Sequence, residues 1–193
     1  MNLLIDTLPN SVVIDGLAYP INTDFRIGIL FEQLMQDTEV DEVQKLDLAI
    51  RLYFKNTVKN KEEAVKQILW FYRCGKAKQE TRNTGNNSTK NEAIYDFDHD
   101  SEYIFSAFYE QYNIDLQDIS NLHWWKFKAL FKGLNKDTKI VEIMGYRSIV
   151  INGKMTKEQQ EYYRKMKRIY KLPSNKTERE KEQQIANVFA SMF

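Results

Sequence analysis

Apolar positions follow one pattern near the start of the chain and a different pattern over the rest. In the first twenty residues, mostly β-branched, aliphatic and aromatic residues form two short runs, Ser11–Ile14 and Leu17–Tyr19, separated by Asp15 and Gly16. This pattern predicts a β-hairpin, because glycine tolerates the positive φ that a two-residue turn requires. Pro20 has no amide hydrogen to donate, so we do not expect the second strand to continue as a central strand.

Beyond the hairpin, apolar residues recur every three or four positions, which is the spacing of an α-helix with one buried face. A residue whose side chain can cap a helix stands before each of the first three segments. These segments predict a three-helix bundle with the hairpin at one end. The expected caps and ends are Thr23 or Asp24 for a helix through Gln36, Asp41 for the next helix, and Asn60 for a third that stops near Gly75.

The second half of the chain repeats the helical pattern. The acidic residues Asp96, Asp98 and Asp100 precede a predicted helix, and we expect them to stabilise its N-terminus, where the helix dipole favours negative charge. We expect Asn113 to end this helix. The later predictions are a tryptophan-rich helix from His123 to Leu134, a helix from Ile140 that stops at Gly145, a helix that begins with the capping box of Thr156 and Gln159 and ends before Pro173, and a charged helix over 177–193.

Residues 76–92 are polar throughout, with Ala77 as the single apolar residue. Such a segment cannot bury enough apolar surface to offset the entropy lost on ordering, so it predicts a flexible linker. The sequence therefore predicts a mainly α-helical protein with a small N-terminal β-hairpin. Its parts are a hairpin and three helices over 1–75, the linker over 76–92, and a C-terminal helical region over 93–193.

The tryptophan-rich helix has two faces of different character. Wound at about 100° per residue, it places Trp124 and most of its other apolar residues on one broad face. Trp125, Lys128 and Lys132 fall together on another face. We consider two interpretations of this second face: a contact for a protein partner, or burial of Trp125 against a second helix of the same chain.

Charge is balanced over the whole chain but unevenly distributed along it. There are 28 lysine and arginine residues against 27 aspartate and glutamate residues, which argues against a general nucleic-acid binder. Residues 1–54 hold three bases and nine acids, whereas residues 154–171 hold seven bases and two acids. Segments of opposite charge can attract one another within a molecule or between copies, so a homo-oligomer is one expectation.

The helix over 157–171 combines a basic face with interleaved tyrosines. Its basic residues are Arg164, Lys167, Arg168 and Lys171. This face has three interpretations: a solvated surface, a contact for an acidic protein, or a contact for a nucleic-acid backbone. Farther on, the apolar residues near the end of the chain, among them Phe189 and Phe193, could dock on a neighbouring copy.

The sequence carries no motif that points to catalysis or to a cofactor. It has no Walker-type phosphate loop, no glycine-rich dinucleotide fingerprint, and neither His99 nor His123 has a nucleophile at a recognisable spacing. Cys74 is the single cysteine, which excludes an intrachain disulfide and a cysteine-rich metal site. No stretch approaches the roughly 18 apolar residues of a membrane span, and no signal peptide begins the chain. We therefore expect a cytoplasmic protein that is not an enzyme and has no cofactor, no metal and no membrane contact.

Four stretches carry a resemblance to a known family. They are Tyr95–Asp100, Leu122–Phe131, Ile143–Arg147 and Tyr162–Met166. In these stretches the sequence resembles the bacteriophage gene product fifteen family, which occurs in tailed phages and prophages of low-GC Gram-positive bacteria. The resemblance covers almost the whole chain and is most specific in the tryptophan-rich stretch.

The resemblance implies a function that the residues alone do not. Members of the family are similar by gene position to tail assembly chaperones, which coat the tape-measure protein and help to recruit tail-tube subunits. The resemblance thus implies a tape-measure or tail-tube partner, a location in the cytoplasm of the bacterial host, and absence from the mature virion. The alternatives are a nucleic-acid-binding or regulatory phage protein that uses the basic helix over 157–171, and a minor structural component of the virion.

Overall fold

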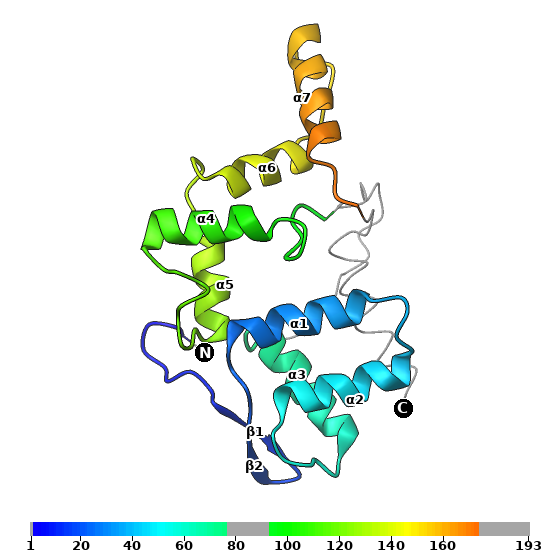
Figure 1. Cartoon of the computed structure of the whole chain (residues 1–193), viewed down its shortest axis with the longest axis vertical. Helices are drawn as coiled ribbons and strands as arrows, with labels where there is room; N and C mark the ends of the chain where they lie inside the picture. Colours follow the sequence, from blue (N-terminus) through cyan, green and yellow to red (C-terminus); the bar gives the residue numbers. More distant parts are fainter. Residues whose placement is uncertain (1, 77–92, 174–193) are drawn as a thin grey trace. The chain divides into compact units, whose positions relative to one another are not determined.

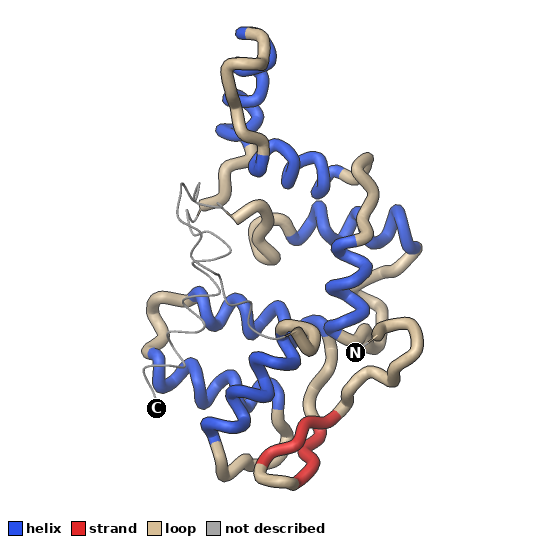
Figure 2. The backbone as a smooth tube through the Cα atoms, turned by 180° about the vertical axis from the view of Figure 1, so that it is seen from behind, coloured by secondary structure: helices blue, strands red, loops and turns tan. Residues whose placement is uncertain are grey.

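The structure is a computed structural model of the 193-residue chain, and it describes residues 2–76 and 93–173. These ranges contain seven helices and one two-stranded antiparallel sheet (Figure 1). Figure 2 shows the backbone from behind, with the helices in blue and the two strands in red. The predicted fold class, mainly α-helical with a small N-terminal β-hairpin, is confirmed. None of the described helices combines the length and the apolar composition needed to cross a bilayer.

The described residues form two compact units. Unit 1 contains residues 2–76 and Ser120–Ala129, and unit 2 contains residues 93–119 and 130–173. The sequence analysis placed Ser120–Ala129 in a C-terminal region over 93–193, but this segment belongs with unit 1 because its two tryptophans are buried among the helices of that unit. Apart from Lys76, the linker predicted over 76–92 lies outside the described residues.

The hairpin of unit 1 follows the prediction. Strands β1 (Ser11–Ile14) and β2 (Leu17–Pro20) pair in antiparallel fashion. The turn residues Asp15 and Gly16 have φ values of 49° and 77°, which are typical of a type I′ turn. On β1, the side chains of Val12 and Ile14 are buried and begin the core of unit 1.

Three helices complete most of unit 1: α1 (Phe25–Gln36), α2 (Glu42–Tyr53) and α3 (Lys61–Tyr72). Each begins after a predicted cap, namely Asp24, Asp41 and Asn60. The side chain of each cap accepts a hydrogen bond from a backbone amide in the first turn of its helix, which satisfies one of the unpaired donors there.

Unit 2 contains α4 (Ser101–Tyr112), α6 (Lys139–Ser148) and α7 (Lys157–Ile169), while α5 (Trp124–Lys132) spans the division between the units. Asn113 ends α4 in the left-handed conformation, with φ at 53°. The capping box predicted at Thr156 begins α7. Within the unit, α6 packs against both α4 and α7 and lies between them (Figure 1).

One predicted helix end is wrong. The sequence analysis stopped the sixth helix at Gly145, but α6 continues through this residue to Ser148. A glycine inside a helix costs about 1 kcal/mol relative to alanine. The contacts of Tyr146 and Arg147, described below, hold the last turn in place and outweigh that cost.

Candidate protein-interaction site

Trp125, the first sequence-based candidate for a partner contact, lies inside unit 1. Only 4% of its surface is exposed, and its indole Nε1 donates a hydrogen bond to the carbonyl oxygen of Phe71 at 2.7 Å. Its ring centroid lies 5.5 Å from that of Trp70 and 5.7 Å from that of Phe71. Trp125 therefore has no surface to offer a partner, and the alternative interpretation, burial against a second helix of the same chain, describes its position.

The neighbouring Trp124 is fully buried in the same unit. Its Nε1 donates to the carbonyl oxygen of Tyr72 at 2.8 Å, and its ring stacks on the Tyr72 ring with centroids 5.5 Å apart. The other side of the indole rests on Gly28 of α1, where an added Cβ would lie 2.4 Å from Cε3 of Trp124. Because Gly28 has no Cβ, it is the residue that lets the tryptophan approach the helix.

The two lysines predicted to flank Trp125 do not form a partner surface with it. Lys128 is half-buried, and its Nζ lies 5.1 Å from the centroid of the Trp124 ring, a cation–π contact within the chain. Lys132 is exposed at the last residue of α5. Because Trp125 is buried, the predicted face of Trp125, Lys128 and Lys132 does not form a surface that a partner could bind.

A buried ion pair that the sequence analysis missed organises unit 2. Arg147 of α6 binds Asp100 with two parallel hydrogen bonds, 2.5 Å from Nη1 to Oδ2 and 2.9 Å from Nη2 to Oδ1. The two side chains are 5% and 0% exposed. Asp100 is the N-cap residue of α4 but makes no side-chain capping bond there. Arg147 follows Ile140 and Ile143 at helical spacing, and an arginine on a buried stripe is the signal that could have indicated a buried partner.

The same arginine fixes the end of α7. The Nε of Arg147 donates to the carbonyl oxygen of Tyr170 at 2.6 Å, and the Nζ of Lys167 donates to the carbonyl oxygen of Arg147 at 2.7 Å. Lys167, predicted as a partner contact, thus holds α7 to α6. Its ammonium group is engaged within the unit and is not a free charge on the open face of the helix.

A cluster of tyrosines also joins α6 to α7. The Tyr146 hydroxyl donates to the Glu142 carboxylate and lies 2.8 Å from the Tyr162 hydroxyl. The Tyr146 ring stacks on the Tyr170 ring with centroids 5.8 Å apart. The hydrogen bond to Glu142, followed by the one with Tyr162, raises the pKa of Tyr146, so its phenol keeps its proton at neutral pH. These contacts join α7 to α6.

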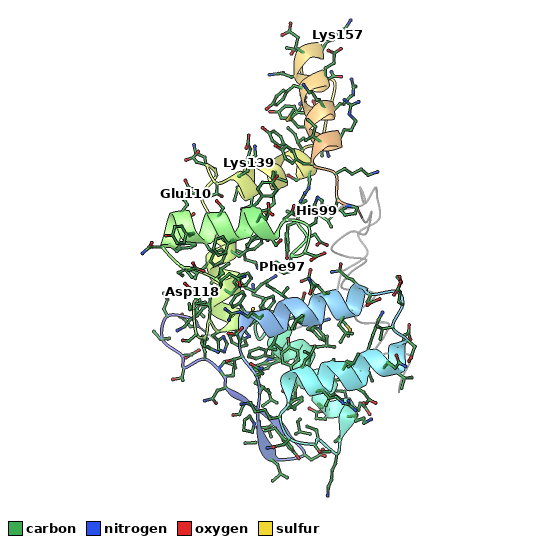
Figure 3. All side chains as sticks on the ribbon, in the orientation of Figure 1. Phe97, His99, Glu110, Asp118, Lys139 and Lys157 are labelled. Carbon is green, nitrogen blue, oxygen red and sulfur yellow. The ribbon has the colours of Figure 1, made fainter. Side chains whose placement is uncertain are left out.

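The rest of α7 is open. None of its residues is buried, and Tyr162 and Ile169 are 48% and 55% exposed. On another side of the helix, exposed bases form a stripe, and none of them forms an ion pair with a described carboxylate. Figure 3 labels Lys157 in the first turn of the helix. We call this stripe the α7 basic stripe; it consists of Lys157, Arg164 and Arg168, with Lys171 just beyond the helix.

Three of the four predicted bases of this helix, Arg164, Arg168 and Lys171, therefore lie on one open surface. Phe189 and Phe193, the other predicted contacts, lie outside the described residues. The sequence analysis could identify the stripe because its residues share one side of a long, regular helix. It could not distinguish Lys167 from its neighbours, because the carbonyl group that binds Lys167 belongs to α6.

The two histidines occupy different surroundings. His123 is half-buried in unit 1, where its Nε2 lies 3.1 Å from the carbonyl oxygen of Pro9 and its Nδ1 accepts the backbone amide of Trp125 at 3.1 Å. This pair of bonds fits a neutral ring protonated on Nε2. Burial, aided by the charge of Lys126, lowers the pKa of His123 against the opposing effect of the Pro9 bond. His99 is exposed.

Within residues 2–76 and 93–173, no three His, Cys, Asp or Glu side chains are grouped so that they could hold a metal ion. Comparison with known proteins gives one match: the model of the bacteriophage Gp15 protein family matches residues 4–172. Neither a curated protein nor a solved structure matches the chain. Because the match spans most of the sequence and includes both units and all seven described helices, the chain belongs to the bacteriophage Gp15 protein family.

Proposed function

We propose that this phage protein is a non-enzymatic tail assembly chaperone that binds the tape-measure or the tail-tube protein. Its membership of the bacteriophage Gp15 family supports a role in phage biology. The resemblance described above implies the tail-assembly role. On this proposal the protein acts in the cytoplasm of its Gram-positive host and leaves the particle before maturation.

The observation that carries the proposal is the open face of α7. A helix of 13 residues with none of them buried has little of the tertiary packing that normally stabilises a helix in water. Here it is held by its end, through Arg147 and Tyr170, and by the tyrosine cluster. A positioned helix that exposes apolar residues on one side and a row of bases on another is a surface suited to binding another polypeptide.

The surroundings of His123 support the non-enzymatic part of the proposal. Both of its ring nitrogens are engaged by backbone groups of unit 1, at Pro9 and Trp125. A ring in this arrangement joins the segment before β1 to the start of α5. It has no nitrogen left to exchange a proton with a substrate.

Co-purification tests the proposal. The tagged protein is expressed together with the tail genes of its phage, and the proteins retained are identified by mass spectrometry. We expect the tape-measure or tail-tube protein to be retained by the wild type and lost with the double variant Arg164→Glu and Arg168→Glu. The control is Lys55→Glu with Lys59→Glu, which makes the same change in charge at exposed positions of unit 1. Equal retention by all three proteins would remove the α7 basic stripe from the site.

A nucleic acid is the second candidate ligand, because the α7 basic stripe has unpaired charges that could bind phosphates. Such binding would fall steeply with salt, by roughly 0.9 log units per log unit of salt for each phosphate contacted. Absence of a shift with duplex DNA or single-stranded RNA at about 50 mM salt excludes this candidate. Absence of the protein from purified particles would likewise exclude a structural role in the virion.

A further inference from the structure

Unit 2 contains two helical segments of opposite charge. Residues 154–171, which include α7, hold seven bases and two acids. Residues 96–118, which include α4, hold no lysine or arginine. Their seven acids are Asp96, Asp98, Asp100, Glu102, Glu110, Asp115 and Asp118. Because α4 and α7 each pack against α6 and lie on different sides of it, these charges are separated within the unit (Figure 1).

The outward face of α4 combines acids with aromatic rings. Its buried residues, Ile104, Ala107 and Phe108, lie on the opposite side of the helix. On the outward side, Glu102 and Glu110 are exposed and form no ion pair with a described base. We call this surface the α4 acidic face; it consists of Glu102, Phe105, Tyr109 and Glu110.

The aromatic part of the α4 acidic face consists of the exposed Tyr109 and the half-buried Phe105. Tyr109 is 54% exposed, and its ring stacks on that of Phe105, with centroids 6.3 Å apart and planes 12° apart. These two residues are one turn apart, so they form a short apolar strip along the helix. Figure 3 labels Glu110, which marks this part of α4.

The two faces match in chemistry. The α7 basic stripe has exposed arginines at positions 164 and 168, one turn apart. The α4 acidic face has glutamates at positions 102 and 110, two turns apart, beside the strip of Phe105 and Tyr109. Two helices laid together about 8–10 Å apart would bring the bases of one opposite the acids of the other.

We propose that the α7 basic stripe of one copy binds the α4 acidic face of a second copy. The two faces cannot meet in one chain while α4 and α7 remain packed on α6. An interface between different surfaces of identical chains is heterologous, so each copy keeps one face open and further copies can add head to tail. The inference rests on the proposed function only in assigning a protein partner to α7. A tail protein that binds α7 would compete with this contact.

Sedimentation velocity of the purified full-length protein tests the inference. The variants are the double reversal on α7, Arg164→Glu with Arg168→Glu, and the double reversal on α4, Glu102→Lys with Glu110→Lys. We expect the wild type to associate as concentration rises, and less so as salt is raised from about 50 to about 300 mM. Each double reversal should weaken association at least about 100-fold, because it places like charges opposite one another.

Mixing the two variants gives the sharpest result. The α7 variant keeps a wild-type α4 acidic face, and the α4 variant keeps a wild-type α7 basic stripe. An equimolar mixture can therefore form the natural contact, and we expect association to return in the mixture although neither variant associates alone. The control with Lys55→Glu and Lys59→Glu should associate like the wild type. Circular dichroism confirms that each variant is folded, and neutral Arg164→Gln with Arg168→Gln replaces a reversal that does not fold.

Three results would overturn the inference. A wild type that stays monomeric at about 100 µM protein and about 50 mM salt has no such contact between copies. Association that is lost in the α7 variant but kept in the α4 variant places a different surface opposite α7. A mixture that fails to associate excludes the head-to-tail arrangement. No tail protein is present in this experiment, so its outcome and that of the co-purification are separate.

Discussion

Replacing Gly28 with alanine tests how tightly unit 1 is built around Trp124. In an ordinary exposed helix this change stabilises by about 1 kcal/mol, because alanine is the better helix former. Here the added methyl group would lie 2.4, 2.5 and 2.7 Å from three carbons of the Trp124 indole. Ordinary contact begins at 3.4 Å, so the indole would have to move by about 1 Å.

The indole has little freedom to make that move. Its Nε1 is bonded to the Tyr72 carbonyl oxygen, its ring stacks with the rings of Tyr72 and Phe127, and it has no exposed surface. Overpacking of a dense core costs about 1–3 kcal/mol, and losing the buried hydrogen bond of the indole costs about 1 kcal/mol more. After subtracting the gain in helix propensity, we expect Gly28→Ala to lower the free energy of unfolding by about 1–3 kcal/mol.

Gly145→Ala is the matched control. Gly145 also lies inside a helix, but an added Cβ there meets nothing within 4 Å. We expect this change to raise the free energy of unfolding by about 0.5–1 kcal/mol. Urea denaturation followed by circular dichroism measures both variants. Stabilisation by alanine at both positions would refute the close contact of Trp124 with α1.

Three further predictions concern buried polar groups. Tyr53→Phe should raise the stability by about 1 kcal/mol, because the Tyr53 hydroxyl is buried with no hydrogen-bond partner in the described structure. A loss of stability in urea denaturation would instead show that the hydroxyl has a partner. Arg147→Met should destabilise the protein by about 3–5 kcal/mol, because it leaves Asp100 buried without its partner. The double variant Arg147→Met with Asp100→Leu should restore part of this loss, and thermal denaturation can measure both variants. Because the pKa of His123 is lowered in the folded state, the contribution of this residue to stability is complete above about pH 6.5 and falls as the pH drops. The difference in unfolding free energy between wild type and His123→Gln should therefore shrink toward about pH 5. A difference that is constant with pH contradicts this expectation.

Local signals in the sequence were sufficient for most of the helices and for the hairpin. The caps at Asp24, Asp41, Asn60 and Thr156 depend on side chains that bond amides within three residues, so the sequence alone contains both partners. The Asp15-Gly16 turn is equally local. These features could be predicted because no distant residue decides them.

Features that depend on distant residues could not be predicted in the same way. The end of α6 is set by the binding of Arg147 to Asp100, 47 residues away in the sequence. The burial of Trp125 depends on Phe71, 54 residues away. Periodicity showed that Trp125 lies on a second face of its helix, but it carries no information about which helix covers that face.

In the candidate site, too, some features could be predicted from the sequence and others depend on distant residues. The open bases Arg164, Arg168 and Lys171 could be predicted because they share one side of a regular helix. Lys167 was grouped with them, since the chain gives no sign that the Arg147 carbonyl oxygen will bind its ammonium group. The α4 acidic face was not predicted either. The acids were noted only before the helix, and the exposure of Glu102 and Glu110 beside Tyr109 emerges from the packing of α4.

The central claim of this account is that the protein holds another polypeptide on the open face of α7. The most direct measurement is a binding titration of the purified protein with its phage's purified tape-measure or tail-tube protein, monitored by calorimetry. We expect binding by the wild type and by the Lys55→Glu, Lys59→Glu control. We also expect a dissociation constant at least about 100-fold higher for Arg164→Glu with Arg168→Glu. Equal affinity of all three proteins for the tail protein, or no binding by the wild type, would contradict it.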